Sequence, residues 1–174
     1  MKEKKTALIL SWWGMKASFT AWVLLWIAAR RDLQRLRPNV LIAGSWSAWT
    51  WAYYLANQYD SIRNIWSNLL TNSRLINFKR LYPIIDINYI IDSICKSIDP
   101  LDVSLIQSSI TKFYIPAFNK HSGSIDYLLQ DGNHDLFEAL RATKAMPIAY
   151  RLNPGVSIWQ FSYCDSILSS LWKN

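Results

Sequence analysis

Apolar runs alternate with short polar segments along the first 60 residues, and their lengths predict a repeated strand, turn and helix. The predicted segments are, in order, a strand over 6–11, a turn over 12–14, a helix over 15–36, a strand over 39–44, a turn over 45–51 and a helix over 52–59. A strand–helix unit that occurs twice predicts an α/β fold with parallel strands. Ligands of such sheets bind at the C-terminal ends of the strands, where both turns lie. We therefore expect the two turns to form one site.

The remaining pattern predicts further helices and a hairpin. Helical patterns cover 60–70, 86–98, 99–107 and 134–145, and Asp60 is the expected N-cap of the first of them. Strands are expected over 112–118 and 124–129, on either side of a turn, and over 148–151 and 156–162. Because neither a linker nor a repeat divides the chain, we expect one domain over 6–174, a three-layer α/β/α fold with a mainly parallel central sheet.

Composition and charge limit the classes of function. Hydrophobic residues make up 51% and charged residues 18%, which is typical of a globular protein. The net charge of +7 favours anionic partners. We expect no nucleic acid, because no dense basic run is interleaved with aromatic residues, and peripheral contact with anionic lipid stays open beside plain solubility. The N-terminus lacks the cleavage site of a signal peptide, which predicts a cytoplasmic protein.

The tryptophan content is abnormal. The chain has 10 Trp and 5 Gly, whereas an average protein of this length has about 12 glycines. Glycine at eight tryptophan positions would restore an ordinary content of about 7%. We hypothesise that the gene uses UGA for glycine and was translated with a code in which UGA means tryptophan; a genuinely Trp-rich domain is the alternative. The eight positions are Trp12, Trp13, Trp22, Trp26, Trp46, Trp49, Trp51 and Trp159.

The second turn has the composition of a nucleophile elbow, in which a serine lies between a buried strand and a helix. With glycine at Trp46 and Trp49, residues 43–49 contain only small residues around two serines. Ser47 is the favoured nucleophile because Ser45 and position 49 are its small neighbours, with Ala48 between. Ser45 is the rival nucleophile. A serine that only caps a helix is the structural alternative.

The first turn is suited to binding an anion. With glycine at Trp12 and Trp13, a run of three glycines precedes Met15 and Lys16 at the start of a predicted helix. Backbone N–H groups of such a loop bind anions at a helix N-terminus. The same letters fit a dinucleotide fingerprint, but the second predicted strand is not followed by the acidic residue that would bind a ribose.

Four motifs together resemble those of the patatin-like phospholipase family. The first turn, 12–17, resembles the family's glycine-rich oxyanion loop, and 45–49 resembles its G-x-S-x-G elbow. Residues 141–147 resemble its helix-ending R-A-S-x-A-x-P motif, and 163–167 resemble its D-G-[GA] motif. The order and spacing of the four motifs agree with the family from residue 6 to about 167.

The resemblance implies a serine–aspartate dyad, which carries over as Ser47 and Asp165, with an oxyanion hole around Trp12, Trp13 and Gly14. It implies hydrolysis of phospholipids or other acyl-ester lipids without metal or organic cofactor. Lys16 would add positive charge near the oxyanion loop, or is simply a solvated lysine. The family domain extends beyond its aspartate, which predicts that this chain is truncated at its C-terminus.

Two departures favour an alternative. Ser45 replaces the first glycine of the elbow, and Ser166 replaces the glycine that follows the aspartate. A catalytically inactive patatin-like module that binds lipid or a partner is therefore the second hypothesis. The two histidines, His121 and His134, both precede Asp165, and we expect ordinary surface or capping roles for them rather than a Ser-His-Asp triad.

Overall fold

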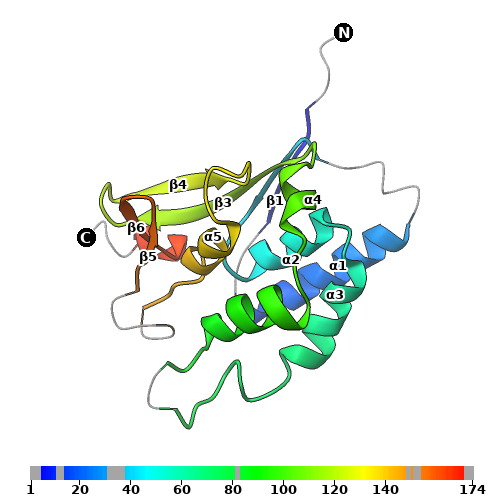
Figure 1. The fold of residues 1–174 in the computed structure, drawn as a ribbon, viewed down its shortest axis with the longest axis horizontal. Coiled ribbons are helices and arrows are strands. Elements are labelled where there is room, and N and C mark those ends of the chain that lie inside the picture. The colour runs from blue at the N-terminus through cyan, green and yellow to red at the C-terminus, as the bar shows by residue number, and fades with distance from the viewer. Residues whose placement is uncertain are drawn as a thin grey trace.

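A computed structural model describes residues 5–10, 14–30, 38–80, 83–147, 150 and 154–170. Its sheet has the strand order β1-β2-β3-β6-β5, and β4 also pairs with β3, outside this order (Figure 1). The strands are β1 (Ala7–Leu10), β2 (Val40–Ala43), β3 (Lys112–Asn119), β4 (Ser124–Leu129), β5 (Val156–Ile158) and β6 (Phe161–Cys164). β1, β2 and β3 are parallel, and β4, β5 and β6 join antiparallel. The α/β class is confirmed, with the parallel part of the sheet formed by the first three strands.

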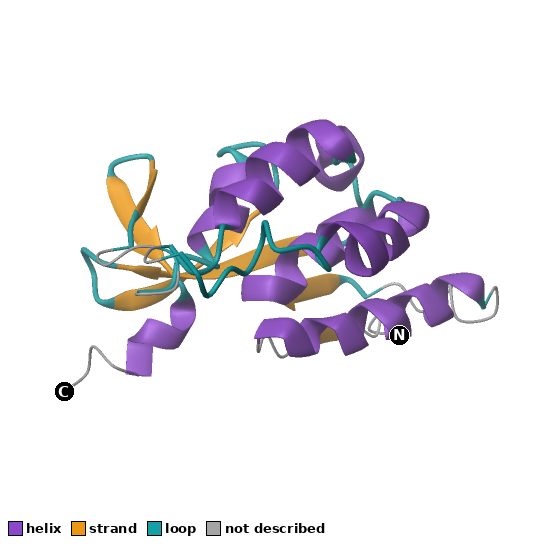
Figure 2. Cartoon of the chain, turned by 90° about the horizontal axis from the view of Figure 1, so that it is seen from below, coloured by secondary structure: helices purple, strands orange, loops and turns teal. Residues whose placement is uncertain are grey.

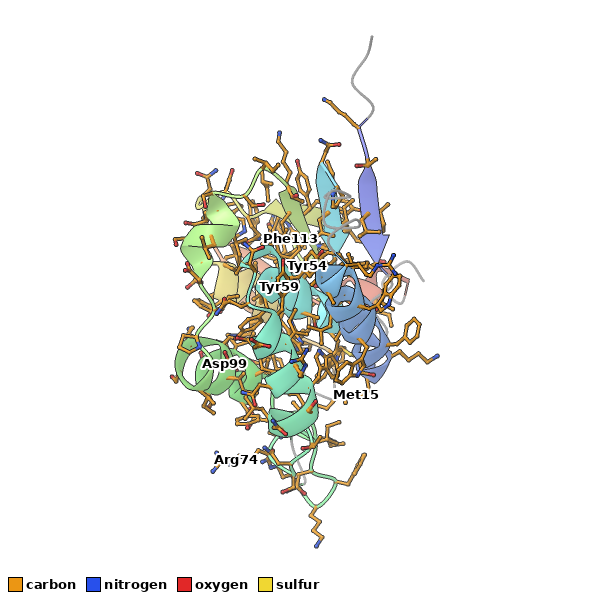
Figure 3. The ribbon with its side chains drawn as sticks, turned by 90° about the vertical axis from the view of Figure 1, so that its right-hand side faces the viewer. Met15, Tyr54, Tyr59, Arg74, Asp99 and Phe113 are labelled. Atoms are coloured by element: carbon orange, nitrogen blue, oxygen red, sulfur yellow. The ribbon has the colours of Figure 1, made fainter. Side chains whose placement is uncertain are left out.

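Helices lie on both sides of the strands (Figure 2). They are η1 (Gly14–Lys16), α1 (Ala17–Ala29), α2 (Ser45–Leu55), α3 (Tyr59–Asn64), η2 (Ile65–Leu69), η3 (Tyr89–Ile98), α4 (Val103–Gln107), α5 (Leu136–Ala142) and η4 (Ser166–Ser170). α1, α2 and α3 pack on one another. Figure 3 shows Tyr54 of α2 beside Tyr59 of α3, with 5.4 Å between the ring centroids. None of the described helices combines the length and the apolar character needed to cross a membrane.

The predicted turn over 45–51 is wrong. α2 begins directly after the strand, so only Gly44 separates β2 from the helix. A Cβ atom on Gly44 would lie 2.9 Å from Cγ of Pro116, which explains why so tight a connection needs glycine. Small residues are common in turns and in tightly packed helices alike, and here they pack: α2 is buried from Ser45 to Tyr53.

The first predicted helix, 15–36, is shorter than expected within the described residues. α1 ends at Ala29, and Arg30 is extended, with φ −98° and ψ 102°. Residues 31–37 lie outside the described part of the chain. Asp60 is not an N-cap, because Gln58 precedes α3 and Asp60 lies in its first turn.

Near the C-terminus, the single strand predicted over 156–162 is in fact the hairpin β5–β6. Ile158 pairs with Phe161, which leaves Trp159 and Gln160 as a two-residue turn. The predicted helix over 99–107 begins only at Val103, because the Asp102 side chain caps it. Of the strand predicted over 148–151, only residue 150 is described, and it lies in a turn.

Candidate functional site

Ser45 occupies the sharp connection between β2 and α2. Its φ of +48° lies in the left-handed region, which only a few per cent of non-glycine residues adopt. A strained serine between a buried strand and a helix is the backbone geometry of a nucleophile elbow. The position also places the serine at the N-terminus of an 11-residue helix, whose dipole stabilises negative charge there.

The Ser45 hydroxyl donates a hydrogen bond of 3.0 Å to Oδ2 of Asp165. The two residues are 120 positions apart in the sequence, and both are almost fully buried. Asp165 follows β6 at the start of η4, and its Oδ1 accepts the N–H of Ile167 at 3.0 Å. η4 packs against β3 and β4, directly after the end of β6. The fold thus brings the end of β2 and the end of β6 together at one serine–carboxylate pair.

A largely apolar cavity of about 410 Å³ opens over this pair. Ser45 and Asp165 line it together with residues from the first loop and from the segments after α5 and β6, namely Gly14, Met15, Lys16, Met146 and Ile167. Gly14 has a φ of +48°, and a Cβ atom there would meet no atom within 4 Å. Gly14 of the first predicted turn and Ser45 of the second therefore line one cavity, as the sequence predicts.

Burial controls the protonation of the carboxylate. It raises the pKa of Asp165 to about 6, because the charged form loses its hydration. The hydrogen bonds from Ile167 and Ser45 act in the opposite direction, as does the positive charge of Lys144. A carboxylate with this pKa is ionised at neutral pH and is a better proton acceptor than an exposed aspartate.

Lys144 is a buried cation whose charge acts on the Asp165 carboxylate. Its side chain is 1% exposed, and its Nζ donates to the backbone oxygen of Leu140 at 2.9 Å. Burial lowers the pKa of Lys144 to about 7, although the charges of Cys95 and Asp165 act to raise it. The lysine therefore exchanges between its neutral and charged forms near neutral pH.

The structure differs from the sequence prediction in the identity of the serine. Sequence reasoning favoured Ser47, but the hydroxyl that bonds to Asp165 belongs to Ser45. Ser47 lies on the first turn of α2 with a side chain that is 0% exposed, and its N–H bonds to the oxygen of Gly44. The rival position named by the sequence, Ser45, is the one that reaches the cavity.

The remaining elbow positions, Trp46, Ala48 and Trp49, are buried in the first turns of α2. The Trp49 indole stacks on Trp66 at 5.2 Å between centroids, but its Nε1 has no hydrogen-bond partner among the described residues. The outer oxyanion positions, Trp12 and Trp13, lie outside the described residues.

Sequence reasoning did not single out four residues near the dyad. These are Thr143, Lys144, Met146 and Ile167. Three of them belong to the motif over 141–147, and the fourth belongs to the motif around Asp165, so those two motifs were the available signal. Arg141, the first residue of its motif, lies in a separate cavity with Asp92 and Glu138.

The histidines lie elsewhere. His121 is in the β3–β4 turn, with its backbone N–H on Asn119, and His134 precedes the Asp135 cap of α5. Among the described residues that line the Ser45 cavity there is no histidine. The described residues also contain no group of three or more His, Cys, Asp or Glu side chains placed to bind a metal ion.

No protein-family model matches the chain, and no curated protein is significantly similar to it.

Proposed function

We propose that this protein is a lipid acyl hydrolase of the patatin-like type, in which Ser45 is the nucleophile and Asp165 is its base. The 3.0 Å hydrogen bond between the Ser45 hydroxyl and the Asp165 carboxylate carries the proposal. Three further observations support it: the left-handed backbone of Ser45, the raised pKa of Asp165, and the apolar cavity above both.

In the first half of the reaction, Oδ2 of Asp165 accepts the proton of Ser45 as Oγ attacks the ester carbonyl carbon. The carbonyl oxygen becomes an oxyanion, which the N-terminal dipole of α2 and the backbone of the first loop stabilise. The tetrahedral intermediate then collapses, the bond to the alcohol breaks, and Asp165 returns its proton to the leaving alkoxide. The products are an alcohol and an acyl group on Ser45.

In the second half, Asp165 takes a proton from a water molecule that attacks the acyl carbonyl carbon. The second tetrahedral intermediate releases the carboxylic acid as the Ser45–acyl bond breaks, and Oγ recovers the proton from Asp165. Every step uses groups that line one cavity.

A lipid substrate fits the surroundings of the dyad. Met15, Met146 and Ile167 offer apolar, adaptable contacts for an acyl chain. Lys16 at the rim of the cavity is suited to a phosphate headgroup. The net charge of +7 and the exposed apolar side chains of α1 favour work at an anionic membrane surface, and we place the enzyme in the cytoplasm.

Two observations favour an inactive lipid-binding module as a second candidate. Ser45 is only 3% exposed, which limits the access of a substrate to its hydroxyl group. Ser166 follows the aspartate at the position where the patatin-like family has glycine. An inactive module would keep the cavity but would not activate the serine.

A fluorophosphonate probe separates the two candidates, because it forms a covalent bond only with an activated serine. The parent protein is made in two forms, one with the given sequence and one with glycine at the eight tryptophan positions. We expect the probe to label the parent protein. Ser45→Ala should abolish labelling. Ser47→Ala is the matched control, because it removes the same hydroxyl group two residues along α2, and it should retain labelling. The labelled peptide is identified by mass spectrometry.

Each outcome decides one point. Labelling that survives Ser45→Ala but disappears in Ser47→Ala returns the nucleophile to Ser47. A parent protein that binds phospholipid vesicles but labels in neither form is the inactive module. Labelled protein that releases fatty acid from phosphatidylglycerol vesicles has the proposed activity.

A further inference from the structure

Thr143 joins the nucleophile to a neighbouring strand through one hydroxyl group. Its Oγ1 accepts the backbone N–H of Ser45 at 2.8 Å and donates to the backbone oxygen of Pro116 at 2.7 Å. The side chain is fully buried, at the C-terminal end of α5. Because a hydroxyl has a single proton, donating it to Pro116 leaves a lone pair directed at Ser45.

The N–H of Ser45 has a particular need for this partner. N–H groups in the first turn of a helix have no acceptor within the helix, and a buried N–H without a partner is destabilising. The left-handed φ of Ser45 adds backbone strain, which persists only where surrounding contacts impose it. The bond from Thr143 supplies both the acceptor and a fixed point for the strained backbone.

The same short segment also holds the other member of the dyad. The backbone oxygen of Ala145 accepts the N–H of Asp165 at 3.1 Å. Residues 143 and 145 are two positions apart, so one short turn after α5 anchors the backbone of both Ser45 and Asp165. The separation of the two reacting side chains therefore depends on this turn.

We propose that Thr143 is a positioning residue, whose hydroxyl holds Ser45 in the left-handed conformation that places its Oγ against Asp165. The catalytic consequence rests on the proposed acyl-hydrolase function, whereas the geometric consequence does not. Thr143 touches no substrate in this account and acts only through Ser45.

The test compares Thr143→Val with Thr143→Ser in the parent form that reacts with the fluorophosphonate probe. Valine keeps the shape of threonine and removes the hydroxyl, whereas serine keeps the hydroxyl and removes a methyl group. We expect Thr143→Val to lower the labelling rate at Ser45 by about 100-fold, the effect of a misplacement of about 1 Å. Thr143→Ser should label at close to the parent rate, although it loses a buried methyl group. A role limited to packing would give the reverse order.

A second readout is independent of activity. Crystal structures of the parent and both variants give the φ of residue 45 and the distance between Ser45 Oγ and Asp165 Oδ2. We expect that distance to exceed hydrogen-bond reach in the valine variant only. Should the valine variant fail to fold, Thr143→Ala takes its place, because the smaller side chain cannot clash.

The outcomes keep the two proposals apart. A parent that does not label rejects the acyl-hydrolase function, and the crystal structures alone then decide the geometric role of Thr143. A valine variant that labels as fast as the parent and retains the 3.0 Å hydrogen bond overturns the inference about Thr143 and leaves the function intact.

Discussion

At the scale of single residues, Asp165 has to serve two opposing needs. Burial raises its pKa to about 6, which makes the carboxylate a better base but penalises its charged form in the folded protein. Because only the ionised carboxylate accepts the serine proton, we expect the labelling rate at Ser45 to be flat above pH 7. Below about pH 6 it should fall roughly tenfold per pH unit. A rate that stays level down to pH 4.5 would exclude Asp165 as the base.

The same shift predicts how stability depends on pH. The pKa of Asp165 in the folded protein exceeds its ordinary value of 3.8. Below pH 3.8 the protonated carboxyl therefore favours folding, and this contribution to stability is lost as the pH rises through about 6. Asp165→Asn cannot ionise and should gain up to about 3 kcal/mol in unfolding free energy, relative to the parent, between pH 4 and pH 8. Denaturant unfolding at the two pH values measures this difference. Removing the Asp165 charge lowers the pKa of Lys144 further, so the titration of the lysine differs between the two proteins and adds to the gain of the variant. An equal difference at both pH values would contradict the pKa.

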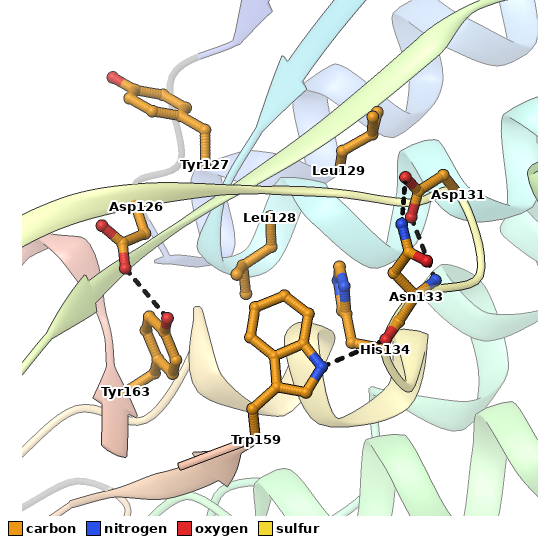
Figure 4. A pocket seen from close by; sticks show the side chains of 9 residues that line it. All are labelled: Asp126, Tyr127, Leu128, Leu129, Asp131, Asn133, His134, Trp159 and Tyr163. Atoms are coloured by element: carbon orange, nitrogen blue, oxygen red, sulfur yellow. Dashed lines mark hydrogen bonds between the residues drawn. The ribbon is translucent and has the colours of Figure 1, made fainter. Parts of the chain in front are cut away.

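Trp159 is the residue at which the composition hypothesis meets the backbone most directly. It has a φ of +54° in the two-residue turn between β5 and β6, and favoured hairpin turns place glycine, asparagine or aspartate at such a position. Its indole is 60% exposed and lies over a second cavity beside His134, donating to the oxygen of Asn133 (Figure 4). That one exposed hydrogen bond offsets little of the strain.

We therefore expect Trp159→Gly to raise the unfolding free energy by about 1 kcal/mol, because glycine adopts a positive φ without steric cost. Trp66→Gly is the matched control, since Trp66 is buried and its Nε1 donates to Thr50. It should lose at least about 3 kcal/mol. Chemical denaturation of both variants gives the comparison. If Trp159→Gly destabilises the protein, the indole at 159 belongs to the native turn.

The choice between Ser45 and Ser47 shows where sequence reasoning stops at the residue scale. The residues around both serines are small or suspected glycines, so the composition locates the nucleophile only to within two residues. What selects Ser45 is the length of the connection: β2 ends at Ala43, and the chain must turn within Gly44 and Ser45. The partners of the turn, Thr143 and Asp165, are 98 and 120 positions away, and local patterns do not contain them.

At the scale of elements, the sequence predicted strands better than their connections. The three parallel strands appear as apolar runs bounded by polar segments, which is why their positions were predicted correctly. The β5–β6 hairpin was missed, because a tryptophan at its turn gives no turn signal. The start of α2 was missed for the opposite reason, since serines, alanines and suspected glycines mimic a turn.

Helix α1 shows what two indoles do to an element. Trp22 and Trp26 lie one turn apart, and they are 49% and 56% exposed, beside an exposed Phe19. Both indoles are therefore directed largely toward solvent. Glycine at the two positions would remove exposed apolar surface, which favours solubility. It would also cost the helix roughly 1 kcal/mol at each position, so the gain from these two sites is in solubility and not in stability.

At the scale of the whole molecule, two of the buried tryptophans leave their polar indole N–H groups unsatisfied by any described residue. Trp49 and Trp51 are at most 2% exposed, and within the described part of the chain neither indole N–H has a hydrogen-bond partner. Each unsatisfied group costs about 1–3 kcal/mol, against a total stability of about 5–15 kcal/mol for a domain. A genuinely Trp-rich core would be expected to satisfy these groups, as it does for Trp66.

Replacing all eight tryptophans by glycine therefore distinguishes two accounts of the molecule. If the indoles are native, removing Trp49 and Trp51 opens cavities beneath α2, and each costs about 3–5 kcal/mol, enough to unfold the protein. If the positions belong to glycine, α2 closes on the neighbouring η2 and positions 12 and 13 present bare backbone N–H groups to the substrate oxygen. We expect the second result: a higher yield of folded protein and faster hydrolysis of a fatty-acid ester by the eight-glycine protein than by the chain with tryptophan. Soluble yield, thermal unfolding and ester hydrolysis of the two proteins, each with its Ser45→Ala control, measure the difference. A tryptophan form that is both more stable and more active would show that the composition is genuine.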